Sequence, residues 1–320
     1  MEPLEPQPVT GTAGPATAVP PMPPMADAPG QWWRPTRNRF WLAVFVVALL
    51  VLTVVFLYPL IWTISASLKP QAQVFDNKLI PKNVHLHNYV DVFTGVPGIT
   101  TGAPFGRWFV NSMYIGVLAA ATVTISSALV AFGFAYFRFP MRNFLFGLVL
   151  ATMMLPGAVT MIPTYLIWNH IGLTNTQYPL WLSNIFGSAF YIFLLRQFFL
   201  GIPRELFEAA RIDGDNFFTM FWRMAVPLAK PALVVSFIFE FKASWTDLTK
   251  PLIYLHDDSS FTIPRGLFAL MSQFNPQNGG HGDYQVVLAA LVIATVPMIL
   301  LFLAGQRYFI EGIATQGRKG

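Results

Sequence analysis

Apolar runs dominate the chain and recur at lengths that suit membrane-spanning helices. A helix needs about 20 consecutive apolar residues to cross the hydrocarbon core of a bilayer. Polar segments separate the runs, so we predict six transmembrane helices, at Phe40–Ile64, Phe109–Phe137, Phe144–Ile167, Tyr178–Phe199, Ala232–Ile253 and Tyr284–Leu303. Prolines lie inside or near the ends of several runs and predict kinks there, as at Pro156 and Pro297.

The composition agrees with an all-α, polytopic integral membrane protein. Hydrophobic residues make up 54% of the chain and charged residues 11%, which is outside the range of ordinary soluble domains. The chain has no cysteine, which excludes disulfides, thiol catalysis and thiolate metal sites. The net charge of +5 does not indicate nucleic-acid binding, because the basic residues flank apolar runs instead of forming one patch.

Residues 1–39 precede the first apolar run, and proline, alanine and glycine dominate them up to Gly30. This stretch lacks the apolar residues needed for a core and ends in Arg34, Arg37 and Arg39. We therefore predict a disordered cytoplasmic tail.

The distribution of basic residues predicts the orientation. If the N-terminus is cytoplasmic, thirteen of the twenty lysines and arginines fall on the cytoplasmic side, five fall on the other side and two lie inside the fifth run. Because cytoplasmic loops carry the excess of basic residues, we predict that both termini are cytoplasmic. The segments at 65–106, 168–177 and 254–283 are then extracytoplasmic.

A polar island of about thirty residues, from Pro203 to Pro231, separates the fourth and fifth runs. Pro203 suits the start of a helix and Gly214 a helix end. Asp215 or Asn216 then caps a second helix, which prolines bring to an end. The island therefore predicts a helix, a glycine turn and a second helix on the cytoplasmic side.

The spacing within this island resembles the "EAA" loop of permease subunits in binding-protein-dependent ABC importers. Glu208-Ala209-Ala210 is followed after three residues by Gly214, and after nine more by Met224-Ala225-Val226-Pro227, where the family usually has isoleucine and leucine for Met224 and Val226. The resemblance implies a type I ABC importer permease fold over residues 107–308. It implies that the loop is a coupling helix that docks on a cytoplasmic ATPase subunit through Glu208, Ala209, Ala210, Asp213, Gly214 and Pro227.

Motifs near the C-terminus resemble the maltose-type, carbohydrate-importing branch. They are Trp245-Thr246-Asp247, with threonine for the usual asparagine, then Pro251-Leu252, Gln306-Arg307-Tyr308-Phe309 and the basic end of a tail at 309–320. The resemblance implies a sugar or oligosaccharide substrate, with glycerol phosphate as an alternative, and a prokaryotic plasma membrane. It implies four kinds of partner: a second, usually unlike, permease, two ATPase subunits, an extracytoplasmic binding protein, which the segment 254–283 contacts, and the lipid bilayer.

The fifth run contains ionisable residues. Glu240, Ser244 and Asp247 are spaced four and three apart and share one helical face. Intramembrane ionisable groups usually face protein or water, so we interpret this face as lining the translocation path or the seam with the partner permease. The alternative is that Asp247 and Lys250 pair locally near the headgroups. Trp245 either stacks on a sugar ring or packs in the protein.

Other classes of function receive less support. The chain lacks a phosphate-binding Gly-x-x-x-x-Gly-Lys-Ser/Thr motif, so we expect ATP and Mg²⁺ on the partner ATPases and no cofactor on this chain. His85, His87 and Asp76 lack a convincing third ligand arrangement for a metal. A secondary transporter working through Glu240 or Asp247 leaves the polar island unexplained, and an intramembrane enzyme lacks a catalytic constellation.

Overall fold

The computed structural model describes residues 39–76, 78–95, 105–275, 277 and 282–316, with side chains from residue 40 to residue 308. Within these ranges every regular element is a helix, which confirms the all-α prediction. Almost all of the predicted N-terminal tail lies outside the described residues, as do the last four residues of the C-terminal tail.

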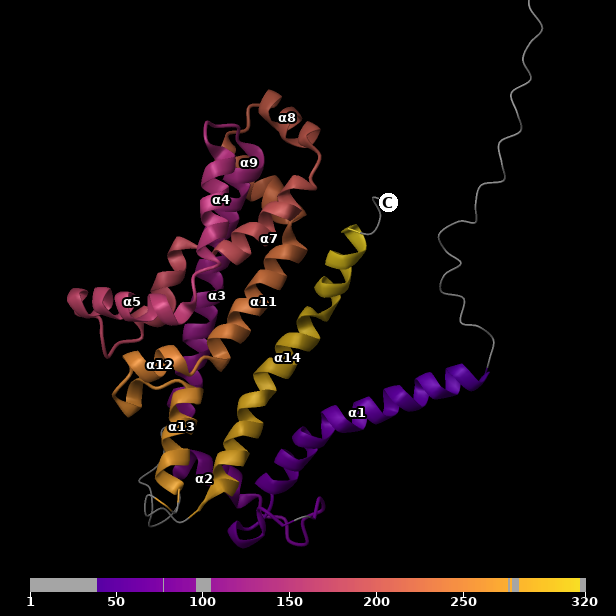
Figure 1. The fold of residues 1–320 in the computed structure, drawn as a ribbon, viewed down its shortest axis with the longest axis vertical. Coiled ribbons are helices and arrows are strands. Elements are labelled where there is room, and N and C mark those ends of the chain that lie inside the picture. The colour runs from indigo at the N-terminus through magenta and orange to yellow at the C-terminus, as the bar shows by residue number, and fades with distance from the viewer. Residues whose placement is uncertain (1–38, 77, 96–104, 276, 278–281, 317–320) are drawn as a thin grey trace, which may run out of the picture. The chain divides into compact units, whose positions relative to one another are not determined.

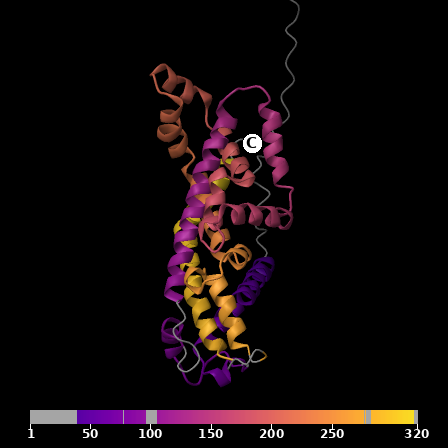
Figure 2. The ribbon, with the colours of Figure 1, turned by 90° about the vertical axis from the view of Figure 1, so that its left-hand side faces the viewer.

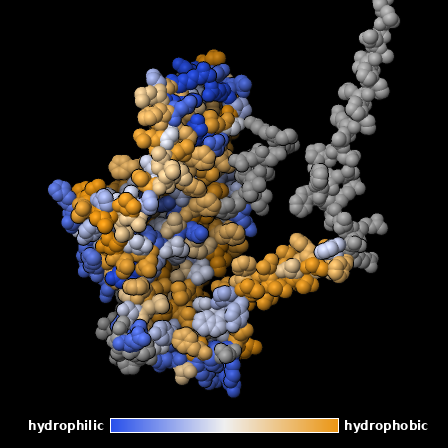
Figure 3. All heavy atoms as spheres, viewed as in Figure 1, coloured by the Kyte–Doolittle hydropathy of each residue, from blue (hydrophilic) through white to orange (hydrophobic). Residues whose placement is uncertain are grey.

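The chain divides into two compact units, Met1–Tyr58 and Pro59–Gly320. The described part of the first unit is the beginning of helix α1 (Arg39–Ser67), which carries exposed apolar side chains on every side. Figure 3 shows the hydrophobic residues along this helix. A helix that is apolar all round suits burial in a membrane or in a protein core.

Helix α3 (Phe105–Tyr136) is the centre of the second unit (Figure 1). It packs against α11 (Lys230–Thr246) and α7 (Ala189–Leu200), and α14 (Tyr284–Gln316) packs against α11. The buried face of α3 contains small residues at regular intervals, among them Gly116, Ala119, Ala120, Ala128 and Ala131. Small residues let membrane helices approach closely, which explains why α3 occupies the centre.

The remaining helices are shorter. They are η2 (Gln71–Gln73), α2 (His87–Thr94), α4 (Arg142–Thr152), α5 (Gly157–Ile171), α6 (Tyr178–Trp181), η3 (Leu182–Phe186), α8 (Arg204–Ile212), α9 (Phe217–Met220), the π-helix η4 (Phe221–Ala225), α10 (Val226–Leu228), α12 (Thr249–Tyr254), η5 (Asp258–Ser260) and α13 (Ile263–Phe274).

Three helical stretches are long and apolar enough to cross a membrane: Phe40–Ser67, Phe105–Tyr136 and Tyr284–Tyr308. Three bent pairs of helices raise the number to six within the described residues if each pair is one span. The third predicted span is one of these pairs, because α4 and α5 meet at 94°. The break falls at Pro156, the N-cap of α5, where the sequence predicted a kink.

The predicted helix over Ala232–Ile253 is interrupted at Asp247 and Leu248 and continues as α12. Helix α11 ends at Thr246, and Asp247 has an extended backbone with ψ of 120°. Pro251 contributes to this break, because a proline has no N–H to bond the carbonyl four residues earlier, here that of Asp247, and its ring clashes with that carbonyl in a continuous helix. At its other end α11 forms a bent pair with the stretch Phe217–Leu228, at 80°.

Two hydrophobic cores lie at opposite ends of α3. We name the first the α8 end; it joins residues Ala128–Ala135 of α3 with α7, α8, α9, η4 and the start of α11. The second, the α13 end, joins Phe105–Ala120 of α3 with α11, α12, α13 and α14. Figure 2 shows α8 and α9 projecting beyond α3 at the first end, and Figure 3 shows hydrophilic residues gathered there.

Candidate functional site

The segment Arg204–Met220 forms the predicted helix, glycine turn and helix. Helix α8 is closed by a Schellman motif, in which the N–H of Asp215 donates to the carbonyl of Ala210 at 3.0 Å and the N–H of Gly214 donates to that of Arg211 at 3.2 Å. Gly214 has φ of +90°, a conformation that residues with a Cβ rarely adopt. The turn therefore requires glycine for its backbone geometry.

The second helix begins where the sequence predicted. The side chain of Asn216, one of the two predicted caps, accepts a hydrogen bond from the N–H of Thr219 at 2.8 Å. The prolines end this helix as predicted. The chain stays helical through the π-helical turn η4 and α10 as far as Leu228, one residue after the exposed Pro227.

Helix α8 has one exposed and one buried face. Glu208 and Ala209 are exposed, as are Asp213 and Gly214 in the turn. Ala210 is only 7% exposed and packs in the core, so only one of the two alanines is open to a partner. Sequence reasoning missed Ile212, which is 86% exposed. It follows Glu208 by four positions and so lies on the same face of the helix. An isoleucine between the polar residues Arg211 and Asp213 was the sequence feature that could have identified it.

Aromatic side chains hold this loop to the end of α3. The ring of Phe207 lies 5.8 Å from that of Phe132 and 5.1 Å from that of Tyr136, measured between centroids. Phe217 lies 6.1 Å from Tyr136, and Phe221 lies 5.4 Å from Phe132. We call these five residues the aromatic cluster. Pairs at such distances add about 0.5–1.5 kcal/mol each beyond their burial, so both helices of the loop are anchored to α3.

The break between α11 and α12 borders a cavity of about 170 Å³, lined among others by Glu240, Ser244, Asp247 and Lys250. The three residues of the predicted polar face, Glu240, Ser244 and Asp247, therefore line one cavity. A second cavity of about 480 Å³ shares Asp247 and Lys250 and extends along α5. Thr262 also lines the first cavity; its buried hydroxyl has no hydrogen-bond partner among the described residues.

Two of the carboxylates in this region also have structural partners. Glu240 accepts a hydrogen bond from the side-chain amide of Asn184 at 2.7 Å. Asp247 accepts one from the backbone N–H of Thr249 at 2.9 Å, and so caps the first turn of α12. Capping explains why Asp247 stands at the helix break.

Trp245, which the sequence grouped with the pathway residues, lies in the core instead. It is 4% exposed, stacks on Phe241 with ring centroids 5.5 Å apart, and donates from Nε1 to the carbonyl of Ala294 at 3.2 Å. It follows the cavity-lining Glu240 of α11 by five positions, a spacing that turns it well away from the face that lines the cavity. The packing interpretation of Trp245 is therefore the one that the structure supports.

At the α13 end, side chains of α3 bind the backbone of the loop between α12 and α13. Trp108 donates from Nε1 to the carbonyl of Asp258 at 2.7 Å, and Asn111 donates to those of Ser259 and Phe261 at 3.0 and 2.9 Å. The hydroxyl of Ser112 accepts the N–H of Ile263 at 2.8 Å. The sequence alone did not reveal these partners.

The candidate metal residues lie apart. Asp76 pairs with the buried Lys69, and His87 lies 3.2 Å from Asp91. In the described part of the chain, no three histidine, aspartate or glutamate side chains are grouped so as to hold a metal ion. The hydrogen bond from Lys69 lowers the pKa of the Asp76 carboxyl below its ordinary value.

Comparison with known proteins shows clear relatives. Residues 127–314 match the family described as "Binding-protein-dependent transport system inner membrane component". The chain is 32% identical over 275 residues to the arabinooligosaccharides transport system permease protein AraQ of Bacillus subtilis (strain 168), a match that covers 85% of this chain and 93% of AraQ. It is also 32% identical to the sn-glycerol-3-phosphate transport system permease protein UgpE of Yersinia enterocolitica serotype O:8, covering 87% of this chain and 98% of UgpE.

Solved structures share the fold. A chain of a bacterial ABC transporter involved in the import of the acidic polysaccharide alginate superposes with a TM-score of 0.74 at 24% identity, covering 85% of this chain and 97% of that chain. A chain from a bacterial alginate ABC transporter in complex with alginate pentasaccharide-bound periplasmic protein gives a TM-score of 0.60 at 15% identity. The match covers 86% of this chain and 95% of that chain.

Proposed function

Because the chain belongs to the family of binding-protein-dependent transport system inner membrane components, we propose that it is the permease subunit of an ATP-driven importer for a sugar or oligosaccharide. The names of relatives such as AraQ support a sugar substrate. UgpE supports glycerol phosphate as the second candidate. The chain is a multi-pass membrane component of a transporter, and we place it in the inner membrane of a prokaryote.

The observation that carries this proposal is the exposed face of α8, on a loop anchored to the central helix. Glu208 and Ala209 are exposed while Phe207 holds the opposite face in the aromatic cluster. Such a helix offers a partner a small acidic and apolar surface that stays attached to α3 when it moves. We assign this surface, with Asp213 and Gly214 at its end, as the dock for a cytoplasmic ATPase subunit. ATP and Mg²⁺ then bind to that subunit and not to this chain.

Helix α3 connects the dock to the other end of the unit. Its residues Phe132 and Tyr136 contact α8, and its residues Trp108 and Asn111 hold the loop before α13. A rigid helix moves as one body, so a shift of α8 on ATPase closure displaces both ends together. Alternation between inward-open and outward-open arrangements then follows from helices that switch between packed states.

The two cavities beside the α11–α12 break are our candidate for the part of the translocation path that this chain lines. Glu240, Ser244, Asp247 and Thr262 supply carboxylate and hydroxyl groups there, and such groups bind the hydroxyls of sugars through hydrogen bonds. A second permease completes the path opposite this surface. Irregular backbone at membrane depth is tolerated where it lines a cavity, which fits the extended backbone at Asp247.

We assign the α8 end to the cytoplasm and the α13 end to the extracytoplasmic side, where a binding protein delivers the solute. The basic residues support this orientation, since Arg138, Arg142, Arg204, Arg211 and Arg223 all lie in the elements or turns of the α8 end. One structural neighbour was solved in complex with a periplasmic protein, which supports a binding protein as a partner here.

Uptake measurements test the substrate class. Cells in which this chain is deleted and restored are supplied with radiolabelled arabino-oligosaccharide or glycerol 3-phosphate at equal concentration. We expect deletion to abolish uptake of a sugar or oligosaccharide and leave glycerol 3-phosphate uptake unchanged. Loss of glycerol 3-phosphate uptake alone would replace the sugar assignment by the second candidate.

The role of the turn is tested by Gly214→Val. An added Cβ meets no heavy atom within 4 Å, so the effect comes from backbone strain at φ of +90°, which is on the order of 1–2 kcal/mol for a residue with a Cβ. We expect membrane insertion to persist while ATP hydrolysis is uncoupled from uptake. Gly214→Asn is the control, because asparagine tolerates left-handed backbone better. Normal substrate-stimulated hydrolysis and uptake in Gly214→Val would contradict the proposed role.

A further inference from the structure

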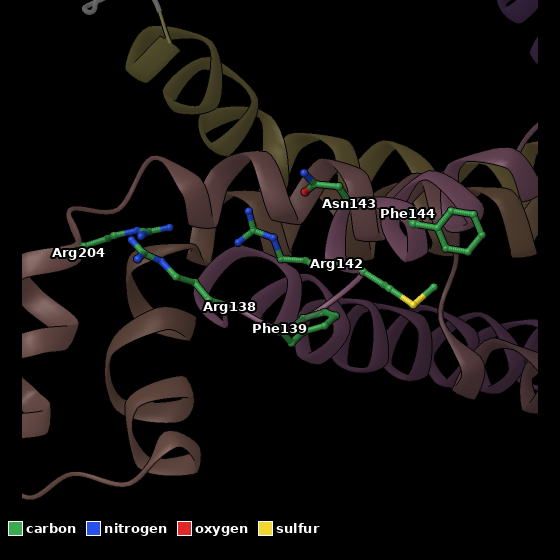
Figure 4. Close-up of a pocket in the computed structure, with 7 residues that line it drawn as sticks. Arg138, Phe139, Arg142, Asn143, Phe144 and Arg204 are labelled. Carbon is green, nitrogen blue, oxygen red and sulfur yellow. The ribbon is translucent and has the colours of Figure 1, made fainter.

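A cluster of positive charge lies at the α8 end, around a pocket of about 590 Å³ between the turn that joins α3 to α4 and the start of α8. Three arginines line it: Arg138, Arg142 and Arg204. Figure 4 shows their side chains extending toward one another across the pocket. Two of them come from the α3–α4 segment, and the third is the first residue of α8.

These arginines have no acidic partner among the residues that the structure describes. The ion pairs between described residues join Lys69 to Asp76 and His87 to Asp91, so no described carboxylate pairs with any of the three. Glu205, the acidic residue in the first turn of α8, is not among the residues that line the pocket. Like charges that point toward one another repel. An anion bound between them would offset this repulsion.

The backbone adds to the positive potential. Helix α4 begins at Arg142 and helix α8 at Arg204, and neither N-terminus is capped by a side-chain hydrogen bond. Free N–H groups and the helix dipole both favour an anion at such a position. The positive φ of Met141, at 60°, fixes the turn that directs the start of α4 toward the pocket.

The remaining lining indicates what kind of anion fits. Phe139, Met141 and Phe144 line the same pocket, and Met141 and Phe144 are each 64% exposed. Leu145 and Leu148 continue this exposed apolar surface along α4. A free phosphate or an acidic peptide would leave these side chains uncovered, whereas a phospholipid covers them with its acyl chains and presents a phosphate to the arginines.

We propose that this pocket binds the phosphate headgroup of an anionic phospholipid. Guanidinium groups bind phosphate oxygens through charge-assisted, often paired hydrogen bonds, and basic pockets at the membrane surface are suited to such headgroups. Because Arg204 begins α8, a bound headgroup also ties the first turn of the candidate coupling helix to the α3–α4 turn. The site is separate from the α8 surface assigned to the ATPase.

The test measures lipid binding to the detergent-purified full-length chain by native mass spectrometry, with phosphatidylglycerol as the probe and phosphatidylcholine as the neutral comparison. The test variant is Arg138→Gln/Arg204→Gln. The matched control is Arg223→Gln, an exposed arginine of the same end that does not line the pocket. Removing two charge-assisted contacts should weaken phosphatidylglycerol binding about tenfold or more, with the control and phosphatidylcholine binding unchanged.

Three outcomes would overturn the proposal. Equal phosphatidylglycerol affinity in the double variant and the native chain would show that the pocket is not the site. An equal loss in Arg223→Gln would show a general surface-charge effect. Displacement of the lipid by inorganic phosphate at the same concentration would show a site for free anions. Co-purification of an ATPase is recorded in parallel, so that a variant that loses the ATPase but keeps lipid binding identifies the arginines as part of a protein interface instead.

Discussion

The two ends of α3 hold their neighbouring loops by different means. At the α8 end the contacts are between aromatic rings, centred on Phe132 and Phe207. At the α13 end they are hydrogen bonds from side chains such as Trp108 and Asn111 to backbone carbonyls. Aromatic contacts persist over a range of ring separations and orientations, while a hydrogen bond weakens steeply when its alignment is lost. The first end therefore permits a small rotation of its loop with contact retained, and the second keeps its loop in one position.

This difference matches the proposed mechanism. A loop that receives motion from a partner must stay attached while it turns, and aromatic contacts allow that. A loop that borders a cavity beside the binding protein needs a fixed position relative to α3. We therefore expect damage at the α8 end to affect coupling first, and damage at the α13 end to affect the folded state of the unit.

The largest effect is expected for Phe207→Ala. Phe207 is 3% exposed, and truncating a buried phenylalanine typically costs about 3–5 kcal/mol. We expect the loss to fall on the docking of α8, so backbone amides of residues 204–216 should exchange with deuterium faster, with little change near α13. Phe218→Ala is the control, since Phe218 is 67% exposed. Equal exchange in the two variants would mean that the aromatic cluster does not hold the loop.

A smaller effect is expected for Gly266→Ala at the other end. The added Cβ would lie 2.1 Å from the nearest ring carbon of Trp108, so the ring must move and its hydrogen bond to Asp258 is disturbed. Overpacking of this kind costs about 1–3 kcal/mol, which should lower the thermal midpoint of the purified protein. Gly147→Ala, where a Cβ meets nothing within 4 Å, should leave the midpoint unchanged. A midpoint for Gly266→Ala equal to that of Gly147→Ala would contradict the close packing of α13 on α3.

The smallest effect concerns pH and the segment between α1 and α2. Lys69 lowers the pKa of the Asp76 carboxyl in the folded chain, so the pair stabilises the fold above the ordinary aspartate pKa. That contribution is lost as the pH falls below about 4, through the lowered folded-state value. The exchange rate of the amides of residues 68–76, measured relative to the intrinsic rate at the same pH, should therefore rise in acid for the native chain. Asp76→Asn should show no such rise, and an identical acid response in both would refute the assignment.

Local chemistry made the α8–α9 loop predictable. The glycine turn and the Asn216 cap depend on residues within one or two turns, and both are found where the pattern placed them. The apolar runs likewise predicted the bounds of the long helices to within a few residues at α3 and at the start of α14. The hydrophobic periodicity and composition of a segment are sufficient to predict such features, because they depend only on residues within that segment.

Features decided by distant segments were not predictable. The chain leaves the helix at Asp247 beside a cavity formed with α3, α6 and α13, and an apolar run gives no indication of that neighbour. Ala209 and Ala210 are chemically alike, yet only contact with the aromatic cluster decides which one is buried. The hydrogen bonds of Asn111 and Ser112 reach residues about 150 positions away, which no local pattern reveals.

The central claim is that the exposed face of α8 is the dock for an ATPase. It is tested most directly by co-purification from detergent-solubilised membranes, with mass spectrometry of the recovered proteins. The native chain and Asp258→Lys, an equal charge reversal at the α13 end, should both recover an ATPase and a second permease. Glu208→Lys should recover the second permease without the ATPase. Full recovery of the ATPase with Glu208→Lys, or a native chain that purifies alone and still moves solute, would contradict the claim.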